Sequence, residues 1–250
     1  MKTDLTLSGS KAMLFAAGLG TRLKPFTDKH PKALAVVGGK TLLQRNLDYL
    51  KGFGIQDVVI NVHHFANQIE EFLLAHADPQ LNIVISFEEE GPFETGGGLV
   101  FAVKNFTETS NPFIVMNVDM LTNLDLQCMF EFHQKITPLA TLAVTKRESS
   151  RQFLFDDEMK LVGWRNNSTG EYKWVANPIE DAKGYSFSGI HIIDPAIFSL
   201  MPTSGTFSIT DIYLRLAASE SIVGYDHSGD LIIDVGKPES IAQAEKMFGV

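Results

Sequence analysis

Short apolar runs alternate with amphipathic segments along the first half of the chain. Runs with the length and composition of buried strands occur at 12–15, 58–62, 81–87, 112–116 and 139–144. Apolar residues at helical spacing lie between them, at 42–50, 66–77, 99–103 and 125–134, with Asp125 as a possible N-cap. Strands joined by covering helices produce this alternation. The pattern predicts an α/β fold, Rossmann-like and doubly wound, with a mostly parallel, mixed sheet.

The second half of the chain has a more irregular pattern. We expect short antiparallel strands at 153–155, 161–164 and 171–175, a longer strand at 185–193, a helix at 210–219 and a last strand at 231–234. A final helix is expected to begin at Pro238, where the missing N–H costs least. Because no repeat or linker interrupts the sequence, we expect one domain over 1–250, in which residues 1–10 form a loose polar extension.

Composition narrows the class of protein. Hydrophobic residues make up 44% and charged residues 20% of the chain, as in soluble globular proteins. The net charge of −9 argues against a nucleic-acid partner. No apolar run approaches the ~18 residues that span a bilayer, so we expect no membrane partner and a cytoplasmic location. The single cysteine, Cys128, fits a reducing compartment, and we expect it to pack in the core rather than to serve as a reactive thiol.

A glycine-containing segment follows the first predicted strand directly, in the sequence Ala-Ala-Gly-Leu-Gly-Thr-Arg at 16–22. Two glycines, Gly18 and Gly20, let the backbone come close to a ligand, and exposed N–H groups can then face a phosphate. Arg22 and Lys32 add positive charge on either side. The segment predicts a binding site for a triphosphate.

Two aspartates follow predicted strands, Asp119 after 112–116 and Asp234 at the end of 231–234. Ligands of doubly wound sheets gather at the carboxyl ends of strands. Two carboxylates with water and phosphate oxygens are a normal Mg²⁺ site. Either aspartate alone could equally cap a turn, but the pair beside a cationic loop favours the metal.

Glycines elsewhere indicate close approaches. Residues 96–98 are three consecutive glycines, which we expect to form a second loop before the helix at 99–103. Three glycines weaken a helix start by roughly 1 kcal/mol each, so a flat ring or an anion is expected close to this backbone. Gly189, inside the strand at 185–193, predicts close approach of a ligand or of another part of the backbone.

The motifs at 15–25 and 31–34 together resemble the signature of the sugar-1-phosphate nucleotidylyltransferases. The resemblance covers essentially the whole chain and includes the segments 117–119, 187–189 and 234–236. It implies a GT-A-like nucleotidyltransferase fold, with 145–230 on the sugar-phosphate side. The segments 94–98 and 187–191 are most similar to the uridylyltransferases of N-acetylmuramate 1-phosphate, which implies UTP as donor and a role in cell-wall recycling.

Two departures from the family pattern concern the sugar. Valine precedes Asp119, where the family usually has glycine, and the segment 174–178 lacks the Glu-Lys-Pro that many relatives use near the sugar phosphate. Mannose-1-phosphate guanylyltransferase therefore stays open as an alternative. A sensor that has lost catalysis and a glycosyltransferase are weaker alternatives, because the sensor would lack one of the charged residues and the glycosyltransferase would lack the glycine loop.

The resemblance also implies a reaction and roles for individual residues. An oxygen of the sugar 1-phosphate attacks the α-phosphorus of a nucleoside triphosphate, and pyrophosphate leaves. Arg22, Lys32 and Asp119 are the implied catalytic residues, and Asp119 and Asp234 the implied Mg²⁺ ligands. The implied nucleotide-binding residues are Ala16, Ala17, Gly18, Gly20, Thr21, Gly96 and Gly97. The implied sugar-phosphate residues are Asn117, Arg151, Ser188 and Gly189, although Arg151 could instead be an ordinary surface charge.

Overall fold

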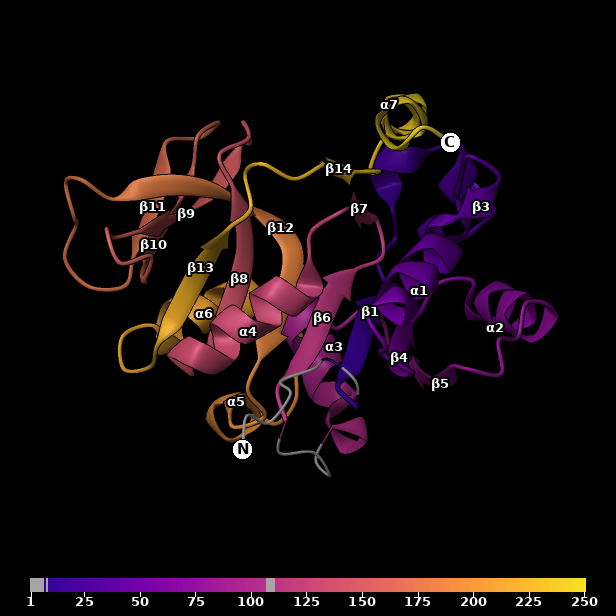
Figure 1. The fold of residues 1–250 in the computed structure, drawn as a ribbon, viewed down its shortest axis with the longest axis horizontal. Helices are drawn as coiled ribbons and strands as arrows, with labels where there is room; N and C mark the ends of the chain where they lie inside the picture. Colours follow the sequence, from indigo (N-terminus) through magenta and orange to yellow (C-terminus); the bar gives the residue numbers. More distant parts are fainter. Residues whose placement is uncertain (1–6, 8, 107–110) are drawn as a thin grey trace.

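The computed structural model describes residues 7, 9–106 and 111–250. Within these residues, ten strands form one mixed sheet in the order β11-β10-β9-β12-β6-β1-β4-β5, while β8 pairs with β12, and β13 with β8 (Figure 1). Their bounds are β1 (Lys11–Phe15), β4 (Asp57–Val62), β5 (Asn82–Phe87), β6 (Phe113–Asn117), β8 (Ala140–Thr145), β9 (Arg151–Phe155), β10 (Leu161–Asn166), β11 (Glu171–Trp174), β12 (Lys183–Ile193) and β13 (Ile222–Asp226).

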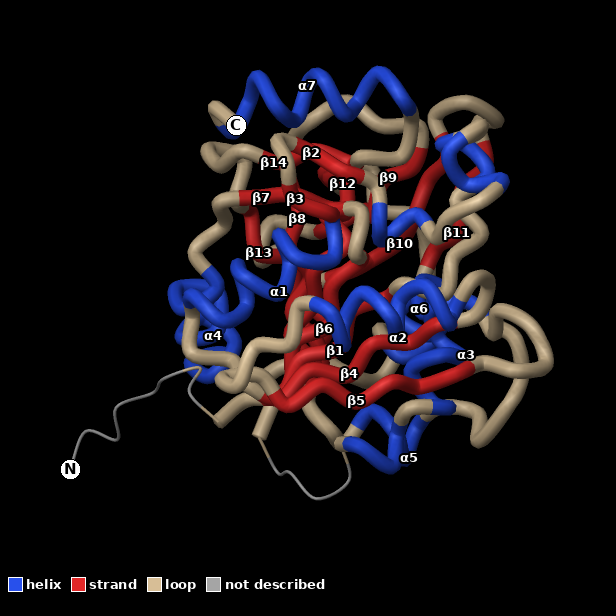
Figure 2. The backbone as a smooth tube through the Cα atoms, turned by 90° about the vertical axis from the view of Figure 1, so that its right-hand side faces the viewer, coloured by secondary structure: helices blue, strands red, loops and turns tan. Residues whose placement is uncertain are grey.

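Helices cover both faces of this sheet (Figure 2), and short strands outside it form separate two-stranded sheets. The helices are α1 (Leu42–Gly52), α2 (Ala66–Ala75), α3 (Glu94–Phe101), α4 (Leu126–Ile136), α5 (Ile197–Leu200), α6 (Ile209–Leu216) and α7 (Pro238–Phe248). The short strands are β2 (Val36–Val37), β3 (Lys40–Thr41), β7 (Met120–Thr122) and β14 (Ile232–Asp234). The predicted α/β class with helices on both faces is confirmed.

Alternation along the strands divides the core in two. Met13 and Phe15 of β1 pack with α3 and α6, whereas Ala12 and Leu14 pack with α1 and α4. Successive side chains of a strand point to opposite faces of a sheet, so one fully apolar strand contributes to both cores. A strand buried on both faces has no polar side, which is why 12–15 is a continuous apolar run.

The sheet is parallel around β1 and antiparallel around β12, while β13 runs parallel to β8. β1 runs parallel to both of its neighbours, β4 and β6, while β12 runs antiparallel to β6, β8 and β9. The last residue of β1, Phe15, lies opposite Asn61 of β4 and Asn117 of β6. The chain therefore leaves β1 at a point where its two neighbouring strands also end, and where such folds bind ligands.

Local capping explains several helix boundaries. The side chain of Thr41 accepts a hydrogen bond from the N–H of Gln44 at the start of α1, and that of Asp125 accepts one from the N–H of Cys128 at the start of α4. These bonds satisfy N–H groups that have no partner within the helix. The helix α7 begins at Pro238, as predicted.

The structure differs from the sequence prediction at the glycine triplet. Residues 96–98 lie inside α3, not in a loop before it. A Cβ atom on Gly96 would meet the Phe207 ring at 2.5 Å, and one on Gly97 would meet the carbonyl oxygen of Gly205 at 2.2 Å. The expected close approach therefore exists, but the chain's own 205–207 segment makes it.

Two further expectations are wrong at particular residues. Leu7 is fully buried in the core beside α1 and α4, so it is not part of a loose extension; residues 1–6 and 8 lie outside the described residues. Cys128 is exposed, because the buried face of α4 is formed by Leu126, Met129, Phe130 and His133. The strands β7 and β13 were not predicted.

Among the described residues, no helix combines the length and apolar character that crossing a bilayer requires.

Candidate active site

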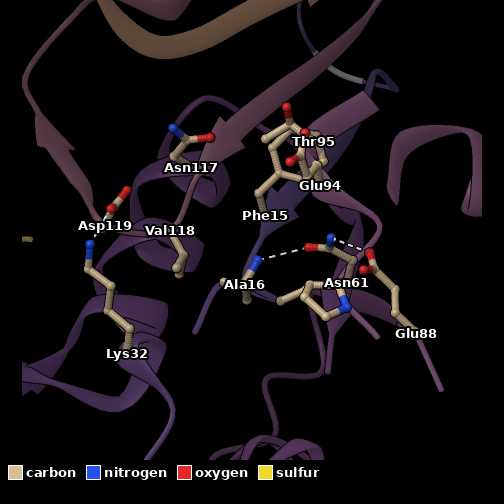
Figure 3. Close-up of a pocket in the computed structure, with 13 residues that line it drawn as sticks. Phe15, Ala16, Lys32, Asn61, Glu88, Glu94, Thr95, Asn117, Val118 and Asp119 are labelled. Carbon is tan, nitrogen blue, oxygen red and sulfur yellow. Dashed lines mark hydrogen bonds and ion pairs between the residues drawn. The ribbon is translucent and has the colours of Figure 1, made fainter. Parts of the chain in front are cut away.

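The segment that follows β1 is held in place by a series of buried hydrogen bonds (Figure 3). The N–H of Ala16 donates to Oδ1 of Asn61 at 2.8 Å, and Nδ2 of Asn61 donates to Oε1 of Glu88 at 2.7 Å. Glu88 is fully buried, and its second oxygen accepts the N–H of Phe93 at 2.8 Å. Because each partner sits on a different segment, this arrangement ties the start of the loop to β4 and to the segment before α3.

Further along, the loop packs against the segment that carries Lys32. Gly20 has a φ of 60°, a left-handed conformation that glycine adopts without steric cost, and its carbonyl oxygen accepts the Thr27 hydroxyl at 3.0 Å. A Cβ atom at Gly20 would lie 3.0 Å from Cβ of Lys32. The second glycine of the motif thus allows the loop to approach Lys32.

Four charged side chains from separate segments meet beside the loop. The ammonium of Lys32 forms an ion pair with Asp119 and lies 3.8 Å from Oδ1 of Asp234. Arg22 reaches Oδ2 of Asp234 at 3.3 Å. The Lys32 side chain is only 10% exposed, whereas that of Arg22 is 59% exposed. Lys32 is therefore the inner cation of this cluster, and Arg22 the outer one.

The short pairing of β7 with β14 brings the two aspartates together. In its register Asp234 lies opposite Met120, the residue after Asp119, and the N–H of Val235 donates to the Asp119 carbonyl at 2.8 Å. The buried side chain of Asn46 donates to the Val118 carbonyl at 2.8 Å and fixes the preceding residue. These contacts join residues more than a hundred positions apart in the sequence.

Two cavities flank this cluster and share Asn117 and Asp119. The first, which we call the loop cavity, has a volume of about 210 Å³ and is lined by residues that include 16–18, Lys32, Asn61, Glu88, Glu94 and Thr95. The second, the arginine cavity, has a volume of about 270 Å³ and is lined by residues that include Arg22, Arg147, Arg151, Trp164, Gly189 and Asp234. Figure 3 shows Lys32, Asp119 and Asn117 along one side of the loop cavity.

Most of the predicted site residues line one of these cavities. Among the residues that the structure describes, five predicted ones line neither: Gly20, Thr21, Gly96, Gly97 and Ser188. Glu94 and Thr95 stand in the loop cavity where we expected the glycines. Ser188 is fully buried, and its hydroxyl lies 2.8 Å from Nε2 of His227, away from the cavity. Gly189, with a φ of 69°, makes room for the Asn117 side chain.

Three polar residues of the site were missed in the sequence. Asn61 is the penultimate residue of β4, Glu88 follows β5, and Arg147 lies two residues beyond β8. The signal was available, because each lies at the carboxyl end of a predicted strand, as Asp119 does. Burial lowers the pKa of Arg147, and the nearby Asp234 carboxylate opposes that shift.

The two aspartates could hold a divalent cation. The Oδ1 atom of Asp234 is buried and has no hydrogen-bond donor among the described residues. No group of three or more His, Cys, Asp or Glu side chains suited to a metal occurs in the described part of the chain. Mg²⁺ needs only one or two carboxylates when substrate phosphates and water complete its shell, so the donor set fits that ion.

The fold and this cluster define a class of protein: Rossmann-like α/β proteins that bind anions at the carboxyl ends of their parallel strands. Comparison with known sequences gives the family. The family described as nucleotidyl transferase matches residues 11–154, so this chain belongs to it. The resemblance inferred from the motifs is confirmed.

Individual relatives differ in their substrates and length. The N-acetylmuramate alpha-1-phosphate uridylyltransferase of Caulobacter vibrioides is 32% identical over 94% of this chain and 95% of its own length. The mannose-1-phosphate guanyltransferase of Yarrowia lipolytica is 28% identical over 95% of this chain, which spans only 64% of that protein. The crystal structure of HddC from Yersinia pseudotuberculosis, complexed with GMP-PN, matches with a TM-score of 0.76 at 22% identity, covering 96% of this chain and 99% of that one. This likeness confirms the GT-A-like nucleotidyltransferase fold.

Proposed function

We propose that this chain transfers a nucleotidyl group from a nucleoside triphosphate to a sugar 1-phosphate, forming a nucleoside-diphosphate sugar and pyrophosphate. The observation that carries the proposal is the meeting of Arg22, Lys32, Asp119 and Asp234 between two cavities. A reaction that joins two phosphorylated substrates needs two adjoining binding sites with cations at their boundary. The sharing of Asp119 by both cavities supports this arrangement.

The loop cavity is the proposed nucleotide site, and the arginine cavity the proposed sugar-phosphate site. The first adjoins the backbone at 16–18, and Glu94 and Thr95 form another part of its wall. The second combines arginines with aromatic side chains such as Trp164, which suit a phosphate and a sugar ring respectively. Arg22 lines the second cavity and is also the outer cation of the charged cluster, where a leaving pyrophosphate would need positive charge.

The chemistry requires positioning and charge compensation rather than a general base. The attacking oxygen belongs to a phosphate that is already an anion. Two like unit charges 4 Å apart repel by about 4 kcal/mol at an effective dielectric constant of 20. Lys32, held in place by its aspartate partners, offers an ammonium fixed before the substrates arrive, and such pre-organisation lowers the barrier. Bound Mg²⁺, held by Asp119 and Asp234, would add charge neutralisation at the phosphates.

Within this reaction we propose UTP as donor and N-acetylmuramate 1-phosphate as acceptor. The match to the Caulobacter vibrioides uridylyltransferase extends over nearly the full length of both chains, which supports this choice. Mannose-1-phosphate guanylyl transfer is the second candidate, because relatives with that name align with 95% of this chain, although they are longer. A location in the cytoplasm, where both substrates would be available, completes the proposal.

A pyrophosphate-release assay tests the reaction and the substrates together. Each of the four common nucleoside triphosphates is paired with N-acetylmuramate, mannose and glucose 1-phosphates in the presence of Mg²⁺. The proposal expects the highest kcat/KM for UTP with N-acetylmuramate 1-phosphate. Best turnover with GTP and mannose 1-phosphate would establish the second candidate. Absence of pyrophosphate from every pair would reject nucleotidyl transfer.

A further inference from the structure

Arg147 has no acidic partner among the described residues, unlike Arg22 and Lys32. Arg22 and Lys32 both form ion pairs, whereas no carboxylate of the described residues pairs with Arg147. Its Nη2 atom donates to the Phe187 carbonyl at 2.9 Å. Its Nε atom is buried and has no hydrogen-bond acceptor within the described part of the chain. The guanidinium therefore keeps unused donors in a cavity wall.

This arrangement is costly unless an anion completes it. A charged group withdrawn from water loses solvation, and an unpaired donor on it loses hydrogen bonds as well. Burial lowers the pKa of Arg147, which reports the same loss of solvation, while the Asp234 carboxylate acts in the opposite direction. A guanidinium stays charged in proteins, so an anion is the partner that would both accept from its free donor and balance its charge.

The backbone around Arg147 is held firmly against β12. The Ser186 hydroxyl donates to the Arg147 carbonyl at 2.7 Å, so side chain and backbone of this residue are both tied to adjacent residues of one strand. The register of β12 against β8 shifts between Phe187 and His191, which marks a bulge beside the cavity. A buried hydrogen bond between the Ser188 hydroxyl and Nε2 of His227 stabilises that bulge. The guanidinium is consequently placed before any ligand binds.

Resting on the proposed function, we propose that Arg147 binds the phosphate of the acceptor sugar 1-phosphate and positions it for attack. Its planar fork matches the geometry of phosphate oxygens, and it lines the cavity that also contains Asp119 and Asp234. The segment 174–178 contains no lysine or arginine, so another part of the chain must supply this charge. Arg151 also lines the cavity but is exposed at the start of β9, where water screens its charge.

Steady-state kinetics of Arg147→Gln and Arg147→Lys test the assignment. Loss of a charge-assisted hydrogen bond should raise the KM for the sugar 1-phosphate about tenfold or more in Arg147→Gln, while the KM for the triphosphate stays near the wild-type value. Arg147→Lys keeps the charge but not the fork, so an intermediate KM is expected.

The matched control is Arg215→Gln. Arg215 lies on α6, outside both cavities, and its Nη2 also donates to one backbone carbonyl, that of Leu200 at 2.6 Å. This variant should show wild-type constants for both substrates. If Arg215→Gln raised the KM for the sugar 1-phosphate as much as Arg147→Gln, the effect would be structural and the assignment to Arg147 would be overturned.

Further outcomes separate this inference from the proposed function. An unchanged KM for the sugar 1-phosphate in Arg147→Gln, or an equal rise for both substrates, rejects the role of Arg147 while leaving nucleotidyl transfer intact. Absence of pyrophosphate release by the wild-type protein rejects the proposed function instead. In that case calorimetric titration of sugar 1-phosphate into the wild type and Arg147→Lys decides whether Arg147 binds it; equal affinity would reject the inference.

Discussion

At the scale of the residue, the site depends on three charge contacts among two cations and two aspartates. Lys32 pairs with Asp119, lies near Asp234, and is almost buried, while Arg22 holds Asp234 from the solvent side. A buried ion pair contributes little net stability, because desolvation offsets most of the attraction. The arrangement is therefore better explained by function than by stability.

The first prediction concerns Asp119. We expect Asp119→Asn to lower the turnover of pyrophosphate release at least about 100-fold, because it removes both a carboxylate of the proposed metal site and the partner of Lys32. The fold should survive, since Asp234 still faces Lys32 at 3.8 Å. Circular dichroism and a thermal melt check the fold.

Asp157→Asn is the control for Asp119→Asn. Asp157 pairs with Lys183 at 2.7 Å on the surface, and exposed pairs contribute about 0–1 kcal/mol. This variant should keep wild-type turnover and melting temperature. Wild-type turnover in Asp119→Asn would show that Asp119 has no catalytic or metal-binding role.

At the scale of the element, α3 shows that packing outweighs intrinsic propensity. Replacing glycine by alanine inside a helix normally stabilises a protein by up to about 1 kcal/mol. Gly96 and Gly97 instead let the helix approach the 205–207 segment, and their N–H groups donate to the Phe207 carbonyl at 2.9 and 3.2 Å; Gly98 makes room for Glu88. The local cost is retained because a side chain has no room.

For this reason Gly97→Ala should destabilise the protein, against the general trend. Its Cβ would lie 2.2 Å from the Gly205 carbonyl oxygen, which is backbone and cannot rotate away. We expect a loss of about 1–3 kcal/mol in urea unfolding, the usual cost of overpacking. At Gly52, the last residue of α1, a Cβ meets no atom within 4 Å, so Gly52→Ala should be neutral or stabilising. Equal effects of the two substitutions would disprove the packing explanation.

The contact between α4 and β8 predicts a pH dependence of stability. His133 of α4 is buried, and its Nδ1 lies 2.8 Å from the Thr141 hydroxyl of β8. Burial lowers the pKa of His133 from 6.5 to about 4, with an opposing contribution from Asp194. Between these values the unfolded chain binds a proton that the folded chain does not, so stability is lost as the pH falls from about 6.5 towards 4.

Measured by urea unfolding at a series of pH values, this contribution of His133 should reach about 3 kcal/mol at most. His133→Gln, which keeps a hydrogen-bonding group but does not titrate, should show a shallower decline over this range. Some decline will remain, because burial also lowers the pKa of His191, to about 3. A wild-type slope in His133→Gln would contradict the assignment. The exposed His76 provides the control, since His76→Gln should leave the slope unchanged.

At the scale of the whole molecule, β12 joins the two halves of the protein. It pairs with β6 on the parallel side and with β9 on the antiparallel side, so the strands of both halves form one continuous sheet (Figure 1). The protein as a whole is acidic, with a net charge of −9, yet three arginines, Arg22, Arg147 and Arg151, line the arginine cavity. Binding of anionic substrates is consequently expected at the junction and not over the general surface.

Ligand-induced stabilisation tests this expectation. UTP with Mg²⁺ at about 100 times its Kd should stabilise the folded state by about 2.7 kcal/mol, which corresponds to a rise in Tm of about 5–10 °C for a domain of this size. Removal of Mg²⁺ by a chelator should abolish the shift and pyrophosphate release together, and added Mg²⁺ should restore both. A full shift in the presence of chelator would show that the triphosphate binds without the metal.

The sequence by itself determined the α/β class, the loop after β1, and the aspartates at the ends of strands. Each of these depends on local features: an apolar run, a glycine pair, or a polar residue at a strand end. Family motifs carried the same information, because they are short and continuous around 16–22, 117–119 and 234–236.

Only the tertiary structure decided which distant residues are in contact and which side chains are buried. Gly96 and Gly97 of α3 are explained by contacts with residues more than a hundred positions away. The burial of Leu7 is explained by the core that it joins, and the exposure of Cys128 by which face of α4 packs against the sheet. The sequence near Arg147 likewise does not indicate that its Nε atom has no acceptor. Only the folded structure shows which acidic side chains lie near an arginine. Contacts between distant segments depend on topology and packing, and local sequence patterns do not encode those distances.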